Sequence, residues 1–169
     1  MNRFVKVGLL ILMLVLFVGC DRLTKNIARE ELASSAGFSY FHGLIQLEYT
    51  ENSGSFMSLG SDLPRIVRQS VHLFSAAVVV TGLVLVGAHV QRIAPKTLAG
   101  LTLLLAGASG NLWDRFFNDG RVIDFIMIDV GRAHTGVFNL ADIFITAGVL
   151  VLFLGAWGWN KPTPSPRGE

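Results

Sequence analysis

The sequence predicts an all-α integral membrane protein with four transmembrane helices and a small β-containing extracytoplasmic element. Its 169 residues are 51% hydrophobic and only 15% charged, whereas a soluble domain carries roughly a quarter charged residues. Charge-free segments also recur along the chain, and about 20 apolar residues are enough for one span. We therefore expect a single membrane domain over residues 1–160 and a disordered tail over residues 161–169.

The four predicted spans are separated by polar segments and carry charged side chains only near their ends. The charge-free parts of the third and fourth spans are close to the lower limit of about 17 residues. We therefore expect flanking residues to extend them. The spans cover approximately residues 4–23, 69–91, 97–113 and 141–160.

The first span has two interpretations. Residues 7–20 carry no charge and end in "VGC", which is typical of a signal peptide whose mature lipoprotein begins at Cys20. A membrane helix over residues 4–23 is favoured, because three further predicted spans follow it. Phe17 also stands where lipoprotein signals favour a smaller aliphatic residue. We expect Cys20 to stay in the helix and to pack against a neighbouring helix.

Four spans place both termini on the same side of the membrane. Lysine and arginine in short loops favour the cytoplasmic side, and Arg92 and Lys96 lie in the shortest predicted connection. We therefore predict cytoplasmic termini and two outer segments, residues 25–68 and 114–139.

Both outer segments have features of β structure. The first begins with a predicted short helix, "KNIAREELA", and continues through "LIQLEYT", in which apolar and polar residues partly alternate as in a strand. The turn-rich "ENSGS" follows. The second segment has a turn signal at "NDG" between two apolar stretches. We expect a small amount of β structure resting on the membrane surface.

Two aspartates are candidates for chemistry, because ionisable side chains are costly in a membrane. Asp142 directly precedes a charge-free segment, and Asp124 lies in the apolar stretch "RVIDFIMI". Each also has an ordinary interpretation. Asp142 can be the N-cap of the last helix, a position that favours Asp. Asp124 can be an exposed acid in a loop.

Other polar residues near the predicted helix ends are open to structural interpretations. Asp21 and Lys25 are four residues apart and can pair on one face of a helix. Asp114 and Arg115 can form an ion pair at the membrane interface. The ordinary polar residues expected at helix ends are Asn111 and Asn139.

Two carboxylates at one membrane face suit acid–base hydrolysis. When two Asp side chains approach closely, they cannot both ionise cheaply, so they share one proton. The ionised carboxylate takes a proton from an attacking water, and the protonated one polarises the substrate carbonyl and helps the amine to leave. The histidines have no zinc-ligand spacing, and no Gly-x-Ser-x-Gly motif or phosphate-binding loop occurs. The single cysteine excludes an internal disulfide, and a net charge of +2 gives no indication of nucleic acid.

Five short blocks along the chain resemble, in the same order, motifs of the bacterial lipoprotein signal peptidases, also called signal peptidase II. The blocks are "DRLTK", "NSGSFMS", "GASGNLWDR", "GRVIDFI" and "FNLAD". The last two match the blocks that carry the catalytic aspartates of that family. Single blocks are short, but their order extends over almost the whole chain.

The resemblance implies an intramembrane aspartyl endopeptidase with Asp124 and Asp142 as its catalytic pair. Such an enzyme removes the signal peptide from diacylglyceryl-modified prolipoproteins just before the lipidated cysteine, at the outer face of the bacterial cytoplasmic membrane. The resemblance implies no cofactor and no metal. We expect a monomer whose partners are prolipoproteins and membrane lipid. Residues expected to shape the site are Asn52, Gly54, Asn111, Arg115 and Asn139, and those expected to hold the helices together are Asp21, Lys25 and Asp114.

The sequence departs from the family pattern without losing either catalytic carboxylate. The approach to the last motif, "GRAHTGVFNLAD", lacks the usual Trp and Pro. These departures leave open a specialised paralogue. A small four-span scaffold or transporter subunit without peptidase activity is the other alternative. The departing side chains are Arg22 in place of Gln, Ser55, Phe56 and Met57 in place of a small-small-Phe run, and Ser109 in place of Leu.

Overall fold

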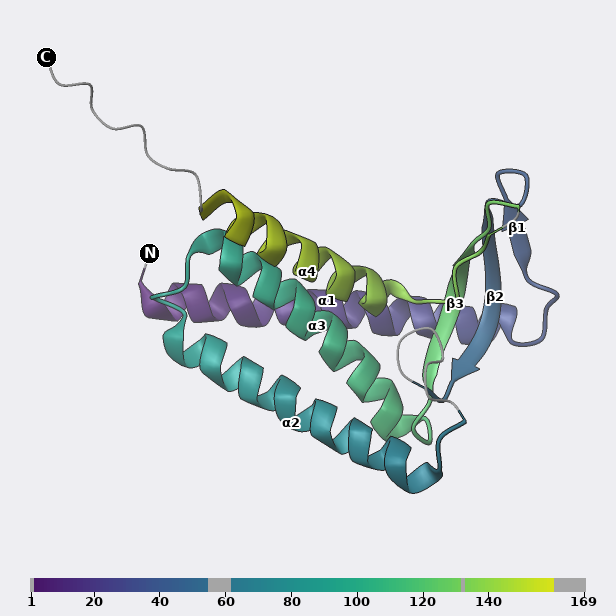
Figure 1. Ribbon diagram of the computed structural model, residues 1–169, viewed down its shortest axis with the longest axis horizontal. Helices are drawn as coiled ribbons and strands as arrows, with labels where there is room; N and C mark the ends of the chain where they lie inside the picture. Colours follow the sequence, from purple (N-terminus) through teal and green to yellow (C-terminus); the bar gives the residue numbers. More distant parts are fainter. Residues whose placement is uncertain (1, 55–61, 132, 160–169) are drawn as a thin grey trace, which may run out of the picture.

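The computed structural model describes residues 2–54, 62–131 and 133–159, and the predicted tail over 161–169 lies outside them. Long helices run side by side, and a small antiparallel sheet in the order β1-β2-β3 lies at one end of them (Figure 1). This architecture confirms the predicted fold class. The helices are α1 (Arg3–Leu32), α2 (Arg65–His89), α3 (Pro95–Phe117) and α4 (Leu140–Trp159), and the strands are β1 (Phe38–Tyr40), β2 (Ile45–Asn52) and β3 (Val122–Ile128).

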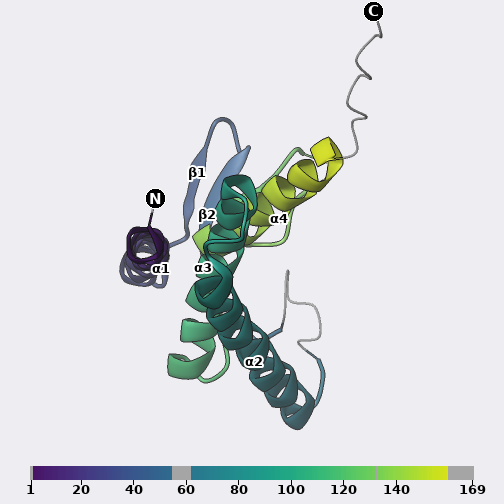
Figure 2. The same cartoon turned by 90° about the vertical axis from the view of Figure 1, so that its left-hand side faces the viewer.

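Different segments of the chain lie at the two ends of the helical part. The start of α1, the connection between α2 and α3 and the end of α4 lie at one end, and the sheet lies at the other (Figure 1). Three described helices, α1, α2 and α4, are long and apolar enough to cross a membrane. α3 is not among them, yet it contacts all three and lies between them when the molecule is viewed along its length (Figure 2).

α1 is longer than the sequence predicted. The helix predicted at "KNIAREELA" is confirmed, but it is the last part of α1, which continues unbroken to Leu32, and not a separate short element. Its outer half buries Asp21, Lys25, Ala28 and Leu32, whose spacing of four, three and four residues forms one helical stripe.

Cys20 lies outside that stripe and is exposed. The prediction that it packs against a neighbouring helix is therefore wrong. The helix passes through Cys20 without a break.

α3 also ends later than the predicted span. It continues through Phe117, so the apolar stretch before "NDG" is the last part of a helix and not a strand. The stretch after that turn is β3, as expected for β structure there. The predicted strand at "LIQLEYT" is confirmed as part of β2.

α3 and α4 approach closely because glycine lies at their contact. A Cβ atom added to Gly148 of α4 would lie 2.6 Å from the backbone nitrogen of Leu104 and 2.7 Å from the carbonyl oxygen of Gly100. Gly107 is equally restricted, because an added Cβ would collide with the carbonyl oxygen of Ala141. Small residues that bring helix backbones together are typical of membrane helix pairs.

The sheet register brings polar residues of β2 and β3 to the same face. Thr50 pairs with Asp124 and Asn52 pairs with Val122, after a register shift between Leu47 and Thr50. Asn52 and Asp124 are therefore diagonal neighbours, because alternate residues of a strand share a face. A cluster of Ala28, Leu32 and Phe125 attaches the sheet to the outer end of α1.

We predict that Gly148→Ala destabilises the protein by about 1–3 kcal/mol, because the new methyl group overpacks the contact between α3 and α4. Gly155→Ala is the matched control on the same helix, since no atom lies within 4 Å of an added Cβ there. Chemical unfolding of both variants in detergent measures the difference. Equal stability of the two variants would contradict close packing at Gly148.

Candidate active site

Asp124 lies in the middle of β3 and is almost completely buried, with 2% of its surface exposed. Its Oδ2 accepts a hydrogen bond of 2.9 Å from Nδ2 of Asn52, the diagonal neighbour on β2. Its Oδ1 accepts one of 2.6 Å from Nδ2 of Asn139. The interpretation of Asp124 as an exposed loop acid is therefore wrong.

Asp142 lies in the first turn of α4, where it forms a reciprocal cap with Asn139. The Asn139 Oδ1 accepts a hydrogen bond of 3.0 Å from the Asp142 amide, and the Asp142 Oδ2 accepts one of 3.1 Å from the Asn139 amide. This is the geometry of a capping box, in which two residues three apart satisfy each other's free amides. Asn139 is thus the N-cap, and Asp142 completes the cap with one of its two carboxylate oxygens.

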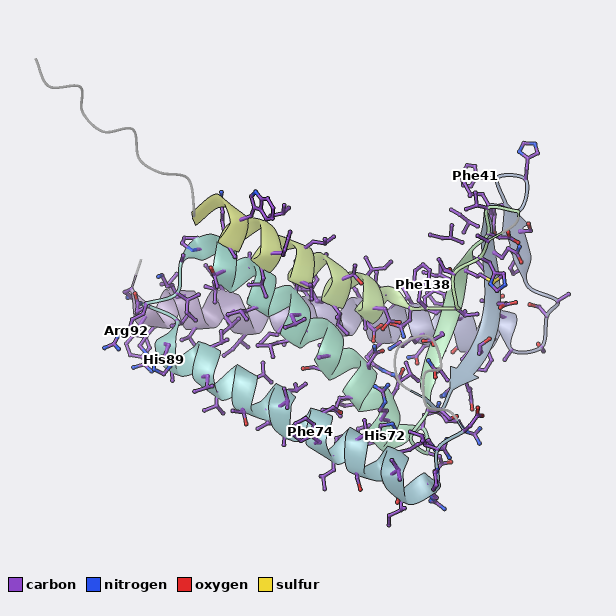
Figure 3. The ribbon with its side chains drawn as sticks, viewed as in Figure 1. Phe41, His72, Phe74, His89, Arg92 and Phe138 are labelled. Carbon is purple, nitrogen blue, oxygen red and sulfur yellow. The ribbon has the colours of Figure 1, made fainter. Side chains whose placement is uncertain are left out.

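Pairing of the backbone before α4 explains why Asn139 reaches Asp124. Phe138 forms an antiparallel bridge with Ile126 of β3, and its carbonyl oxygen accepts from the amide of Phe125 at 3.0 Å. Phe138 lies where β3 meets the start of α4 (Figure 3). The next residue, Asn139, is therefore held beside β3, where it bonds both carboxylates.

Asn111 of α3 bonds both Asp142 and Asn139, the residue that bonds Asp124. Its Nδ2 donates a hydrogen bond of 2.8 Å to Oδ1 of Asp142. Its Oδ1 accepts from Nδ2 of Asn139 at 3.0 Å and from Nζ of Lys25 at 2.9 Å. The side-chain amide of Asn111 therefore links α1, α3 and the start of α4.

Lys25 is fully buried in an ion cluster next to this amide. Its Nζ lies 2.8 Å from Oδ2 of Asp21 and 2.9 Å from Oδ2 of Asp114, which confirms the predicted pair of Asp21 and Lys25. Asp21 also accepts a hydrogen bond of 3.0 Å from the amide of Ala141 in α4. Asp114 accepts one of 3.2 Å from the amide of Ile123 in β3.

The second partner of Asp114 is Arg22 and not Arg115, so the predicted pair of Asp114 and Arg115 is wrong. Sequence reasoning treated Arg22 only as a departure from a family pattern. The signal that could have identified its role is its spacing of three residues from Lys25, which places both cations on one side of α1.

Arg115 connects α3 to the segment after β2. Its Nη2 donates to the carbonyl oxygen of Gly54 at 3.2 Å, and its Nη1 donates to that of Asn111 at 3.4 Å. Gly54 is held in turn by Asn52, whose Oδ1 accepts from the Gly54 amide at 2.9 Å. The residues predicted to shape the site thus lie in one connected network around the two aspartates, whereas Ser55, Phe56 and Met57 lie outside the described residues.

The environment of Asp124 favours its protonated form. Burial raises the pKa of this carboxyl group from 3.8 to about 6, and the charge of Asp142 acts in the same direction. The hydrogen bonds from Asn52 and Asn139 oppose the shift, because they stabilise the carboxylate. Over residues 2–54, 62–131 and 133–159, no three His, Cys, Asp or Glu side chains gather as a metal site would require.

Two aspartates, one buried and one part-buried, share one asparagine at the end of the helix bundle, an arrangement compatible with a membrane aspartic peptidase. Comparisons with known proteins agree with this class. The family model of signal peptidase (SPase) II matches residues 12–157. A lipoprotein signal peptidase from a Cyanothece species is 37% identical over 125 residues, covering 74% of this chain and 66% of that relative. One from Chlorobium phaeovibrioides is 30% identical over 154 residues, covering 85% of this chain and 88% of the relative.

The fold has solved counterparts as well. The structure of a bacterial membrane enzyme aligns with a TM-score of 0.76 at 22% identity, over 96% of this chain and 95% of the other. The chain belongs to the signal peptidase II family. It is a multi-pass membrane aspartic peptidase that acts on prolipoproteins.

We predict that Lys25→Met destabilises the protein by about 3–5 kcal/mol, because it leaves two buried carboxylates without their shared cation. Lys96→Met, at an exposed position, is the matched control and should change stability by less than about 0.5 kcal/mol. Chemical unfolding in detergent compares both variants with the wild type. If Lys25→Met lowers the free energy of unfolding no more than Lys96→Met does, the ion cluster does not stabilise the fold.

A pH dependence of stability follows from Asp124. The folded state holds its proton more tightly than the unfolded chain, where the pKa is 3.8. Its contribution to stability is therefore fully present below about pH 4 and is lost as the pH rises through about 6. Between about pH 4 and about pH 7, the unfolding free energy of the wild type should fall by about 3 kcal/mol relative to that of Asp124→Asn. Parallel unfolding curves of the two proteins across this range would contradict the shift.

Proposed function

We propose that Asp124 and Asp142 are the catalytic pair of this peptidase. The observation that supports the assignment is their common partner Asn139, whose side-chain amide bonds Asp124 and whose backbone amide bonds Asp142. One asparagine thus holds the two carboxyl groups in a fixed relation, and their hydrogen bonds come from amides rather than from cations. Groups of this kind can share a proton, which acid–base hydrolysis requires.

Asp124 is the acid of the pair in this proposal, and Asp142 is the base. Both carboxyl groups accept two amide hydrogen bonds, but Asp124 is almost completely buried, which favours a proton on it, whereas Asp142 is only part-buried. Asp142 takes a proton from a water whose oxygen attacks the scissile carbonyl carbon, as Asp124 gives its proton to the carbonyl oxygen. The resulting tetrahedral diol then collapses.

Collapse returns the pair to its starting state. Asp142 gives its proton to the nitrogen of the leaving amine, the C–N bond breaks, and one diol hydroxyl returns its proton to Asp124. The products are a new carboxyl group on the signal peptide and a free amine on the mature chain. Each aspartate thus regains its starting protonation state, and water is the only reactant besides the substrate.

The supporting residues fall into three groups by their contacts. Asn52, Asn111 and Asn139 bond the reacting carboxyl groups directly, so they orient them. Arg115 fixes Gly54 at the end of β2, which places that backbone at the border of the site. The residues that join the helices beneath the pair are Asp21, Lys25 and Asp114.

The substrate in this proposal is a prolipoprotein that carries a diacylglyceryl group on its cysteine, and cleavage occurs just before that residue. The chain acts as a monomer in the bacterial cytoplasmic membrane, with cytoplasmic termini and its site near the outer face. The position of the carboxylates supports this arrangement. They belong to β3 and to the first turn of α4, and these two segments meet at the end of the molecule opposite Arg92 (Figure 3). A site at the end of the bundle suits a substrate whose lipid remains in the membrane.

We predict that Asp124→Asn and Asp142→Asn each lower the turnover of a diacylglyceryl-modified prolipoprotein by at least about a hundredfold, because each removes one proton-transfer group. Purified protein in detergent is mixed with the substrate, and cleavage is followed by gel shift. Asp129→Asn is the matched control, because Asp129 bonds Gln46 at a distant part of the sheet. Cleavage by both site variants at the wild-type rate would refute the assignment. Loss of cleavage in the Asp129 variant as well would attribute the effect to the sheet.

A further inference from the structure

A basic cavity of about 980 Å³ lies beside the site, between the outer ends of α2 and α3 and the sheet. Neither Asp124 nor Asp142 is among the described residues that line it. Its position is marked by His72, which lies on the outer half of α2 (Figure 3). The charged residues of its wall are Arg65, Arg68, Arg115 and Arg121, with Glu51 and Asp119 as the acids.

Two of these arginines have no carboxylate partner among the described residues and can therefore bind an added anion. Arg121 is paired with Glu51 at 2.8 Å, whereas neither Arg65 nor Arg68 forms an ion pair with a described residue. Arg68 has one contact of 3.5 Å, to the carbonyl oxygen of Ser53. Residues 55–61, which lie outside the described residues, contain no acidic side chain in the sequence, so they supply no carboxylate to neutralise these arginines.

Buried donors without an acceptor point to the same cavity. The Nε atoms of Arg68 and Arg115 are both buried and have no hydrogen-bond partner among the described residues. A buried unsatisfied donor is costly, and a charged one more so. α2 adds further positive potential, because its first turn has no acidic residue and its start has no side-chain cap.

Apolar side chains also line the cavity. Leu73 and Phe116 line it and are 71% and 66% exposed, and the neighbouring Phe74 is 71% exposed. In a membrane protein such side chains contact acyl chains. Cations above apolar side chains at the end of a span match a phospholipid, whose phosphate lies directly above its acyl chains.

We propose that this cavity binds the phosphodiester headgroup of an anionic phospholipid of the outer leaflet, with Arg65 and Arg68 as its principal ligands. Arginine suits this role because its planar fork bonds two phosphate oxygens at once. The diacylglyceryl group of a prolipoprotein is uncharged and does not account for the excess of cations. The acidic side chain of a substrate peptide would account for the charge but not for the apolar wall.

Lipid titration of the delipidated full-length protein in mild detergent tests the proposal, with native mass spectrometry to count bound lipid. The probes are dioleoyl phosphatidylglycerol, dioleoyl phosphatidylcholine and inorganic phosphate. We expect phosphatidylglycerol to bind most tightly, and the double variant Arg65→Gln with Arg68→Gln to weaken it by about tenfold. Arg92→Gln is the matched control, since Arg92 is exposed at the opposite end of α2 (Figure 3).

Each other outcome overturns the proposal. Equal binding of phosphatidylglycerol by the wild type and the double variant would exclude the cavity as the lipid site. Equal competition by inorganic phosphate would show a free-anion site instead. The double variant could also bind lipid as the wild type does, but cleave more slowly only those substrates that have acidic residues after the cysteine. This result would show that the cavity binds the substrate peptide. If the double variant does not fold, the single variant Arg65→Gln repeats the test, because Arg65 is at an exposed position. Lipid binding is measured directly, so its result does not depend on peptidase activity.

Discussion

The buried ammonium group of Lys25 is the interaction on which the rest of the site depends. Its three contacts are Asp21, Asp114 and Asn111, and each of these reaches a different part of the chain. Asp21 bonds the backbone of α4, Asp114 bonds the backbone of β3, and Asn111 bonds the carboxylate of Asp142. A buried cation is stable only when all its partners are present. The cluster therefore requires α1, α3, α4 and β3 to adopt one relative arrangement.

The aspartates of this network divide into two chemical kinds. Asp21 and Asp114 contact the ammonium group of Lys25 directly, so each is an ion-pair partner within the cluster. Asp124 and Asp142 receive hydrogen bonds from amides instead. An amide supports a carboxylate without neutralising it, so a proton can still be held by the pair. The same small volume thus contains carboxylates suited to cohesion and carboxylates suited to proton transfer.

The sequence predicted the elements of this fold better than their ends. Charge-free segments gave the helices, alternation gave β2, and five ordered blocks gave the residues around the pair. The continuation of α1 to Leu32 was missed, because its C-terminal half is polar and is buried by contacts with α3, α4 and the sheet. The partners of Asp114 were missed for a similar reason. Its contacts with Arg22 and Lys25 join residues far apart in the chain, and local spacing favoured its neighbour Arg115.

The low hydropathy of α3 has the same physical origin as the site. This helix buries Asn111 and Asp114 together with glycines and Thr102, so composition alone does not rank it with the other spans. Its glycines allow α4 to approach closely, and that approach brings the start of α4 within hydrogen-bonding distance of Asn111. Polar side chains at such a contact face protein instead of lipid, where their hydrogen bonds are satisfied. The helix that carries Asn111 and Asp114 is therefore not among the candidate spans by composition, and its neighbours supply the hydrophobic surface that keeps it in the membrane.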